Sequence, residues 1–120
     1  MKYLMLIYTA PGAFEGLSEE DRAAMMNEGR RHTEELAASG ELVSGAALAD
    51  VENSKTVRVR EGVPATTDGP FAEAKEQLAG YYVVDCEGIE RATEIASGDP
   101  AARFWAVEVR PIMDEVGMEM

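Results

Sequence analysis

The sequence contains little of the chemistry that metal binding and covalent catalysis require. Its 120 residues include one cysteine, Cys86, and one histidine, His32. A lone cysteine excludes an intrachain disulfide, which fits a protein kept in a reducing cytoplasm. One His and one Cys far apart give no metal-ligand spacing, so we expect neither a metal nor a cofactor. The absence of a glycine-rich phosphate loop and of a nucleophile elbow argues against a nucleotide enzyme or an ordinary hydrolase.

Basic residues and long apolar runs are also scarce. Lysine and arginine number 11 against 23 acids, which gives a formal net charge of −12. This charge repels phosphate backbones and anionic membranes, so we expect no nucleic-acid or membrane partner. The apolar run Lys2–Tyr8 is far shorter than the about 20 residues of a membrane span and lacks a signal-peptide cleavage site. Apolar residues make up 46% of the chain, so we expect one cytoplasmic domain over residues 1–120.

Hydrophobic periodicity predicts an alternation of strands and helices. The predicted elements are, in chain order, a strand at Lys2–Tyr8, a helix capped by Ser18 and running to about Ser39, strands at Glu41–Leu48, Lys55–Arg60, Val63–Thr66 and Gly80–Val84, a helix at Gly88–Ser97 and a strand at Phe104–Arg110. Glu61 and Gly62 are typical of a hairpin turn. The order is β-α-β, hairpin, β-α-β, which predicts an α+β fold of ferredoxin-like plan with an inserted hairpin.

Such a plan leaves one face of the sheet without helices. The strand Lys2–Tyr8 is apolar on both sides, and so is much of Tyr81–Val84. No further helix is predicted that could cover the second face. A second copy of the chain, packed with its sheet against this sheet, would cover the second face without any further element, so we expect a homodimer.

The stretch from residue 67 to residue 85 combines a turn, a charged segment and a strand. The run DGPF at residues 68–71 begins with turn chemistry, and we expect the ring of Phe71 to be buried. A mixed-sign cluster follows, made of Glu73, Lys75 and Glu76. The cluster is either an ion-pair set in which Lys75 binds a carboxylate or phosphate, or a solvated charged face. We expect a site near this loop.

Two residues are candidates for proton transfer. His32 lies on the apolar stripe of the first helix, where it is either a general acid/base or a half-buried histidine bonded to the sheet, to Glu28 or to Glu35. Asp68 is either a base that orients a ligand or an Asx cap of its own turn.

Strand residues supply the candidates for ligand binding. Arg58, Arg60 and Arg110 each lie on the side of their strand opposite to its valines. They are either surface charges, or one of them binds an anion through two hydrogen bonds. Tyr81 and Tyr82 point to opposite faces of the sheet, so one packs under the helices and the other faces the cavity.

Five segments carry a resemblance to a known family. They are Lys2–Tyr8 (KYLMLIY), Gly40–Gly45 (GELVSG), Thr56–Arg60 (TVRVR), Asp68–Tyr82 (DGPFAEAKEQLAGYY) and Val107–Pro111 (VEVRP). Together they resemble the YCII-related proteins, in particular the branch named for its DGPF motif. The resemblance covers nearly the full chain.

The resemblance implies a dimeric α/β barrel of the ferredoxin-like kind. In the wider YCII group a His–Asp pair has been suggested as an enzyme-like site, and its helix histidine aligns near Gly29, about one turn before His32. The DGPF branch is similar to proteins encoded beside extracytoplasmic-function sigma factors, which implies a regulatory setting. The residues that carry over from it directly are Asp68, Glu73, Lys75, Glu76 and Arg110.

Two hypotheses for the function follow. In the first, a cavity lined by the DGPF loop binds a small polar or anionic molecule, and Asp68 or His32 moves a proton on it. The residues expected to bind that molecule are Lys75, Glu73, Glu76, Arg110, Arg58 and Tyr82. In the second, the protein is a non-enzymatic regulatory or interaction module linked to a sigma factor, and the DGPF loop braces the dimer.

Overall fold

The computed structural model describes residues 1–72 and 74–113. Its elements are, in chain order, β1 (Lys2–Thr9), α1 (Glu19–Ser39), β2 (Leu42–Ala47), the 3-10 turn η1 (Val51–Asn53), β3 (Lys55–Arg60), β4 (Val63–Asp68), β5 (Gln77–Asp85), α2 (Ile89–Gly98), α3 (Pro100–Phe104) and β6 (Ala106–Pro111). Strands β2, β5, β1 and β6 form, in that order, a four-stranded antiparallel sheet. Strands β3 and β4 pair separately as a second antiparallel sheet. The predicted α+β class is confirmed.

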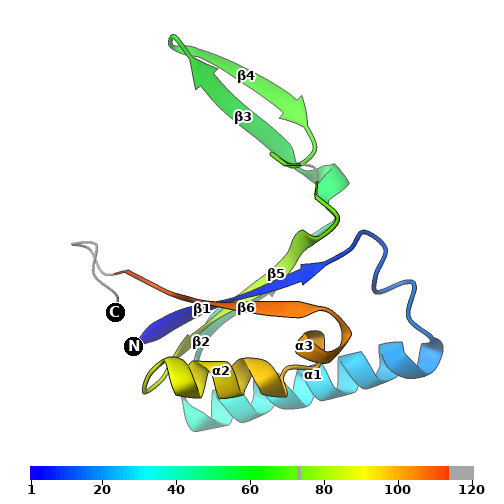
Figure 1. Cartoon of the computed structure of the whole chain (residues 1–120), viewed down its shortest axis with the longest axis vertical. Helices are drawn as coiled ribbons and strands as arrows, with labels where there is room; N and C mark the ends of the chain where they lie inside the picture. The colour runs from blue at the N-terminus through cyan, green and yellow to red at the C-terminus, as the bar shows by residue number, and fades with distance from the viewer. Residues whose placement is uncertain (73, 114–120) are drawn as a thin grey trace.

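The three helices lie on one face of the four-stranded sheet (Figure 1). Tyr3, Met5 and Val84 point toward them and are at most 2% exposed. Because side chains alternate along a strand, the residues between them point to the other face. Within the part of the chain that the structure describes, no helix covers that other face, which we call the open face and define by Leu4, Tyr81 and Val83.

Helix α1 begins and ends where the local chemistry predicts. The Ser18 Oγ accepts a hydrogen bond from the Asp21 N–H at 3.1 Å, and acidic residues fill the first turn. Gly40 ends the helix at φ 80°, a left-handed conformation that costs glycine little. Although α1 has 21 residues, no described helix is both long and apolar enough to cross a membrane.

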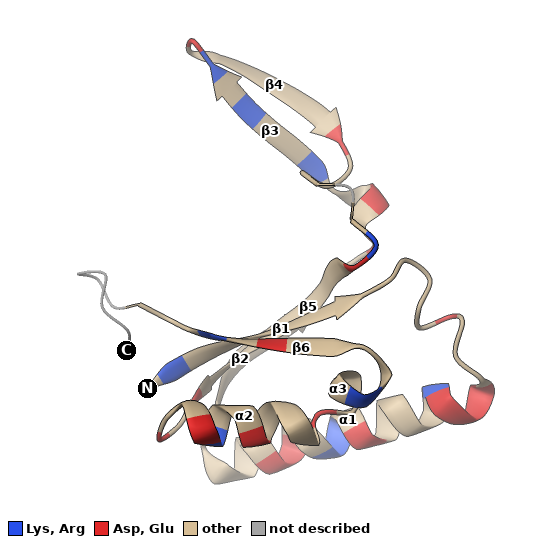
Figure 2. Cartoon of the chain, in the orientation of Figure 1, with Lys and Arg blue, Asp and Glu red and all other residues tan. Residues whose placement is uncertain are grey.

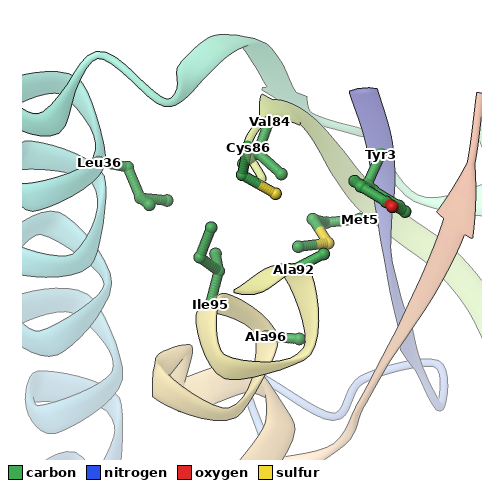
Figure 3. Packing of buried hydrophobic residues seen from close by; sticks show 8 residues of the cluster. All are labelled: Tyr3, Met5, Leu36, Val84, Cys86, Ala92, Ile95 and Ala96. Carbon is green, nitrogen blue, oxygen red and sulfur yellow. The ribbon is translucent and has the colours of Figure 1, made fainter. Parts of the chain in front are cut away.

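The hydrophobic core lies between the sheet and the helices (Figure 3). It consists of residues from β1, β5, α1 and α2, together with Cys86, which follows β5. These residues are Tyr3, Met5, Val84, Cys86, Leu36, Ala92, Ile95 and Ala96. Burial raises the pKa of the Cys86 thiol, so this cysteine acts as a small apolar residue.

The starts of two strands differ from the prediction by two or more residues. β5 begins at Gln77 and not at Gly80, because the segment before the glycine pairs with the end of β1. β6 begins at Ala106 and not at Phe104, because Asp99 ends α2 and then caps a further short helix, α3. Its carboxylate accepts the Ala101 N–H at 2.8 Å, and proline occupies the first helical position.

The hairpin β3–β4, residues 55–68, projects from the body of the protein, and we call it the arm (Figure 1). Its turn contains Glu61 and Gly62 at φ 53° and 77°, as the sequence predicts for a tight hairpin. The positive φ of both residues matches the twist of the two strands.

An ion pair joins α2 to Glu41, the residue that precedes β2. Arg91 donates to the Glu41 carboxylate through Nε at 2.9 Å and through Nη2 at 2.7 Å. These bonds, with a further one from Ser39, lower the pKa of Glu41 from 4.5 to about 2. A lowered carboxylate pKa stabilises the folded state above the unfolded pKa, and this contribution is lost as the pH falls toward the folded value.

We therefore expect Glu41→Gln to lower the melting temperature at neutral pH and to have little effect near pH 2, where Glu41 is already about half protonated in the folded protein. Circular dichroism melts across that range measure the difference. Glu94→Gln is the control, because Glu94 lies 3.5 Å from the same arginine with its side chain 70% exposed. A deficit in Glu41→Gln that is equal at both pH values would contradict this role.

Candidate functional site

A cavity of about 660 Å³ lies between α1 and the helix-facing side of the sheet. Met25, Gly29 and Leu36 of α1 form one wall, and residues of β1, β2 and β5 form the other. Trp105 and Phe14 add aromatic surface. Most of this lining is apolar, as is usual for sites that bind small molecules.

Small residues on two neighbouring strands create this space. Gly45 and Ala47 of β2 pair with Tyr82 and Gly80 of β5. A Cβ on Gly45 would lie 2.8 Å from the Tyr82 Cβ, and one on Gly80 would lie 3.1 Å from the Ala46 carbonyl oxygen. Because these glycines have no side chain to extend toward α1, the helix and the sheet do not fill the volume between them.

Three polar side chains from different elements meet at the cavity. They are His32 of α1, Tyr82 of β5 and Asp99, which connects α2 to α3. The Tyr82 hydroxyl donates to Asp99 Oδ2 at 2.8 Å, and its oxygen lies 3.4 Å from His32 Nε2. The rings of His32 and Tyr82 meet edge to face, with centroids 6.1 Å apart. We call these residues the His–Tyr–Asp chain.

The hydrogen bonds determine which group holds each proton. A phenol has one proton, and Asp99 accepts the one from Tyr82. The arrangement that satisfies all three groups therefore has a proton on His32 Nε2, which donates to the Tyr82 oxygen. Nδ1 then carries the free lone pair, beside Gly98, where an added Cβ would lie 3.6 Å away. The chain thus leaves one basic nitrogen on His32.

Burial sets the charge state of the tyrosine. Asp99 is 6% exposed, and Tyr82 is half-buried beside it. Desolvation, with the nearby Asp99 charge, raises the pKa of Tyr82 far above its usual 10. Tyr82 therefore stays protonated at neutral pH and serves as a hydrogen-bond donor, not as a base.

The structure brings together two of the sequence-predicted site residues, His32 and Tyr82. The sequence predicts a hydrogen bond from His32 to the sheet, to Glu28 or to Glu35. In the structure the partner is Tyr82, a residue of the sheet. Glu28 instead pairs with Arg103, at 2.8 Å, across the surface of α1 and α3.

The DGPF loop, which we predicted to line a cavity between the sheet and the loop, does not line this cavity on the helix side of the sheet. None of the described lining residues comes from residues 68–71, because that run closes the base of the arm. The Gly69 N–H donates to the Ser54 carbonyl at 2.7 Å, and the Thr56 hydroxyl donates to the Gly69 carbonyl at 2.9 Å. The Asp68 carboxylate accepts from Lys55 Nζ at 2.6 Å and is solvent-exposed.

Phe71 is not buried as expected. Its ring is 71% exposed, and the Arg58 guanidinium lies 4.6 Å from the ring centroid. The ring packs against this cation at the arm and does not enter the core of the single chain.

The remaining predicted residues lie on separate surfaces of the single chain. Arg110 forms an ion pair with Glu108 on β6. Lys75 and Glu76 are exposed in the segment before β5. Arg60 lies near the tip of the arm. Glu73 is outside the described residues.

Sequence reasoning missed Asp99 as a site residue. The pair Asp99-Pro100 was interpreted as the end of a helix, although Asp before Pro is also a typical start of one. No local pattern could connect Asp99 to Tyr82, because 17 positions separate them and only the packing of the α2–α3 junction on β5 joins them.

Comparison with known proteins agrees with the fold. The YCII-related domain matches residues 1–116, which confirms the resemblance to that family. An uncharacterised protein of Rhizobium meliloti (strain 1021) is 30% identical over 116 residues, covering 93% of this chain and 92% of its own. A solved structure with a TM-score of 0.54 and 15% identity covers 98% of this chain and 99% of its own. It is 5-chloro-2-hydroxyhydroquinone dehydrochlorinase (TftG) from Burkholderia phenoliruptrix AC1100 in complex with 2,5-dihydroxybenzoquinone.

Tyr82→Phe should destabilise the protein, because it removes a donor from a carboxylate that is 6% exposed. We expect a loss of about 1–3 kcal/mol in the free energy of unfolding, measured by urea denaturation. Tyr81→Phe is the matched control, since Tyr81 is the neighbour on the open face and its hydroxyl makes no hydrogen bond to the described residues. Equal losses in the two variants would show that the Tyr82 hydroxyl has no special role.

Gly45→Ala should also destabilise the protein, because its Cβ would meet the Tyr82 Cβ at 2.8 Å. We expect a loss of about 1–3 kcal/mol from this overpacking, again by urea denaturation. Gly29→Ala is the control, since the nearest atom to its Cβ is 3.9 Å away and alanine favours a helix. If Gly45→Ala unfolds at the same urea concentration as the native protein, the close approach of β2 and β5 does not constrain this position.

Proposed function

The chain belongs to the YCII-related domain family, and within it we propose that the protein binds a small planar molecule in the cavity under α1 and moves a proton on it. The observation that carries this proposal is the His–Tyr–Asp chain at an otherwise mostly apolar cavity. A volume of about 660 Å³ lies within the range typical of ligand sites.

In this proposal His32 exchanges the proton with the ligand. Nδ1, the ring nitrogen not bonded to Tyr82, accepts a proton from an acidic hydroxyl of the ligand, and the ring becomes an imidazolium; this step requires the ligand to reach the side of the ring that lies beside Gly98. Tyr82 accepts the Nε2–H and itself donates to Asp99, so the carboxylate charge stabilises the imidazolium through the phenol. The same proton returns to the ligand, or to water, when the product leaves. No cofactor is needed for this step.

The apolar walls indicate the class of ligand. Met25, Leu36 and Trp105 favour a flat, largely apolar ring, and the His–Tyr–Asp chain favours a hydroxyl or carbonyl group on its edge. The dehydrochlorinase that shares the fold is described in complex with a dihydroxybenzoquinone, a molecule of this kind. We therefore propose hydroxylated quinones and quinols as the substrate class.

The assembly and family branch are part of the proposal. The strand order β2-β5-β1-β6, with all helices on one face, supports a ferredoxin-like body. The apolar open face supports a homodimer of barrel type, in which the sheets of two copies face each other. The run DGPF at residues 68–71 supports the DGPF branch, and the single buried Cys86 supports a cytoplasmic location.

Calorimetric titration with 2,5-dihydroxybenzoquinone and with hydroquinone tests the proposed function. We expect saturable binding to the native protein, and binding at least about tenfold weaker in His32→Gln, because that variant lacks the basic nitrogen. Because the proton passes from the ligand to His32 inside the complex, the absorption spectrum of the bound ligand should shift toward its deprotonated form in the native protein and not in the same variant. Asp68→Asn is the control and should bind like the native protein, since Asp68 is exposed on the arm.

Equal binding by the native protein and His32→Gln would exclude this use of the His–Tyr–Asp chain. If neither ligand binds, the acid–base proposal fails for this substrate class. The hypothesis of a regulatory module that partners a sigma factor would then be preferred.

A further inference from the structure

The arm exposes an apolar face that the rest of the described chain does not cover. Val57 and Val59 point to one side of β3, where they pair with Thr66 and Pro64 of β4. The two valines are 60% and 56% exposed. We call these four residues the valine face. Because an isolated two-stranded hairpin is only marginally stable in water, this face needs a cover.

The dimensions of the chain also indicate a missing neighbour. The radius of gyration is 16.4 Å, against about 14 Å for a compact chain of this length. The accessible surface is 8109 Å², against about 6,300 Å² for a typical monomer of this mass. The excess is larger than the roughly 800 Å² that each partner buries in a standard protein interface. The chain thus has enough uncovered surface for a stable interface.

The charge of the arm suits a second copy of the chain. The arm contains three basic and two acidic residues, whereas the rest of the chain contains eight basic and 21 acidic residues. Figure 2 shows this contrast, with basic positions along β3 and acidic ones along α1 and α2. Arg58 and Arg60 have no carboxylate within ion-pair distance among the described residues. Two chains of net charge −12 repel each other, and the arm, with three basic and two acidic residues, is less acidic than the rest and so reduces this repulsion where it meets a partner.

The arm stands on the side of the sheet away from the helices, the side of the open face (Figure 1). A molecule seated on the open face would therefore lie beside the arm. The arm and the open face are thus two apolar surfaces that one partner can cover together.

We propose that the valine face of each arm packs on a second copy of this chain, next to its open face, in a reciprocal two-fold contact. The proposal rests on the homodimer proposed above and goes beyond it, because it makes the arm, and not the sheet alone, part of the interface. Residues of the DGPF run then hold the base of an interface element: Gly69 bonds to Ser54 and Thr56, and Asp68 pairs with Lys55.

Sedimentation equilibrium of the full chain tests this proposal. Val57→Asn and Val59→Asn each place a polar side chain on the valine face, and we expect each to weaken dimerisation at least about tenfold, because the change occurs twice in a dimer. Val63→Asn is the matched control. Val63 is 65% exposed on the same hairpin, but it pairs with Arg60 and points to the side opposite to the valine face. The dissociation constant of the Val63→Asn dimer should therefore differ from that of the native dimer by less than about twofold.

The possible failures are distinguishable. If the native chain is monomeric at every concentration, both the homodimer and the arm interface are wrong. If the native chain is a dimer that Val83→Asn on the open face dissociates, but Val57→Asn and Val59→Asn do not, the homodimer stands and the arm interface is overturned. A larger effect of Val63→Asn than of the other two arm variants would also overturn it. Circular dichroism of each variant must show the native spectrum for these outcomes to count.

Discussion

The buried carboxylate of Asp99 connects three parts of the fold. One oxygen caps α3, and the other accepts the hydroxyl of Tyr82 from the centre of the sheet. Through Tyr82 it also reaches His32 on α1. A carboxylate that is 6% exposed is costly unless it is hydrogen-bonded, so these partners are required for stability as well as for the site. Here the same contacts stabilise the fold and orient the histidine.

One helix serves both the core and the cavity. Leu36, near the end of α1, packs into the core with Ile95 and also borders the cavity, whereas Met25 and His32 line the cavity and are not part of the core. The difference arises from the opposite wall. Opposite Val84, side chains fill the volume between α1 and the sheet. Opposite Gly45 and Gly80, that volume stays open as the cavity. The apolar stripe of the helix is continuous, so the sheet residues decide which part of it lines a site.

The two layers of this fold protect only one face of the sheet. The helices cover the face that contains Tyr3 and Met5, and the proposed partner copy would cover the other. The arm departs from this compact plan, because its strands pair only with each other. Its exposed valines and its basic strand are understandable if the functional unit contains two chains. The DGPF run at its base then has a mechanical role, which its distance from the cavity in the single chain supports.

The sequence alone determined the features that depend on near neighbours. Ser18 and Gly40 define α1, and Glu61 with Gly62 defines the hairpin, because caps and turns are set by contacts within a few residues. The position of His32 on an apolar stripe likewise made it a candidate. Only the tertiary structure decided that His32 meets Tyr82 and Asp99, because these residues are brought together by packing over 50 and 17 positions of sequence. It also decided that Phe71 is exposed in the single chain, because burial depends on which element lies opposite a ring, and no local pattern specifies that.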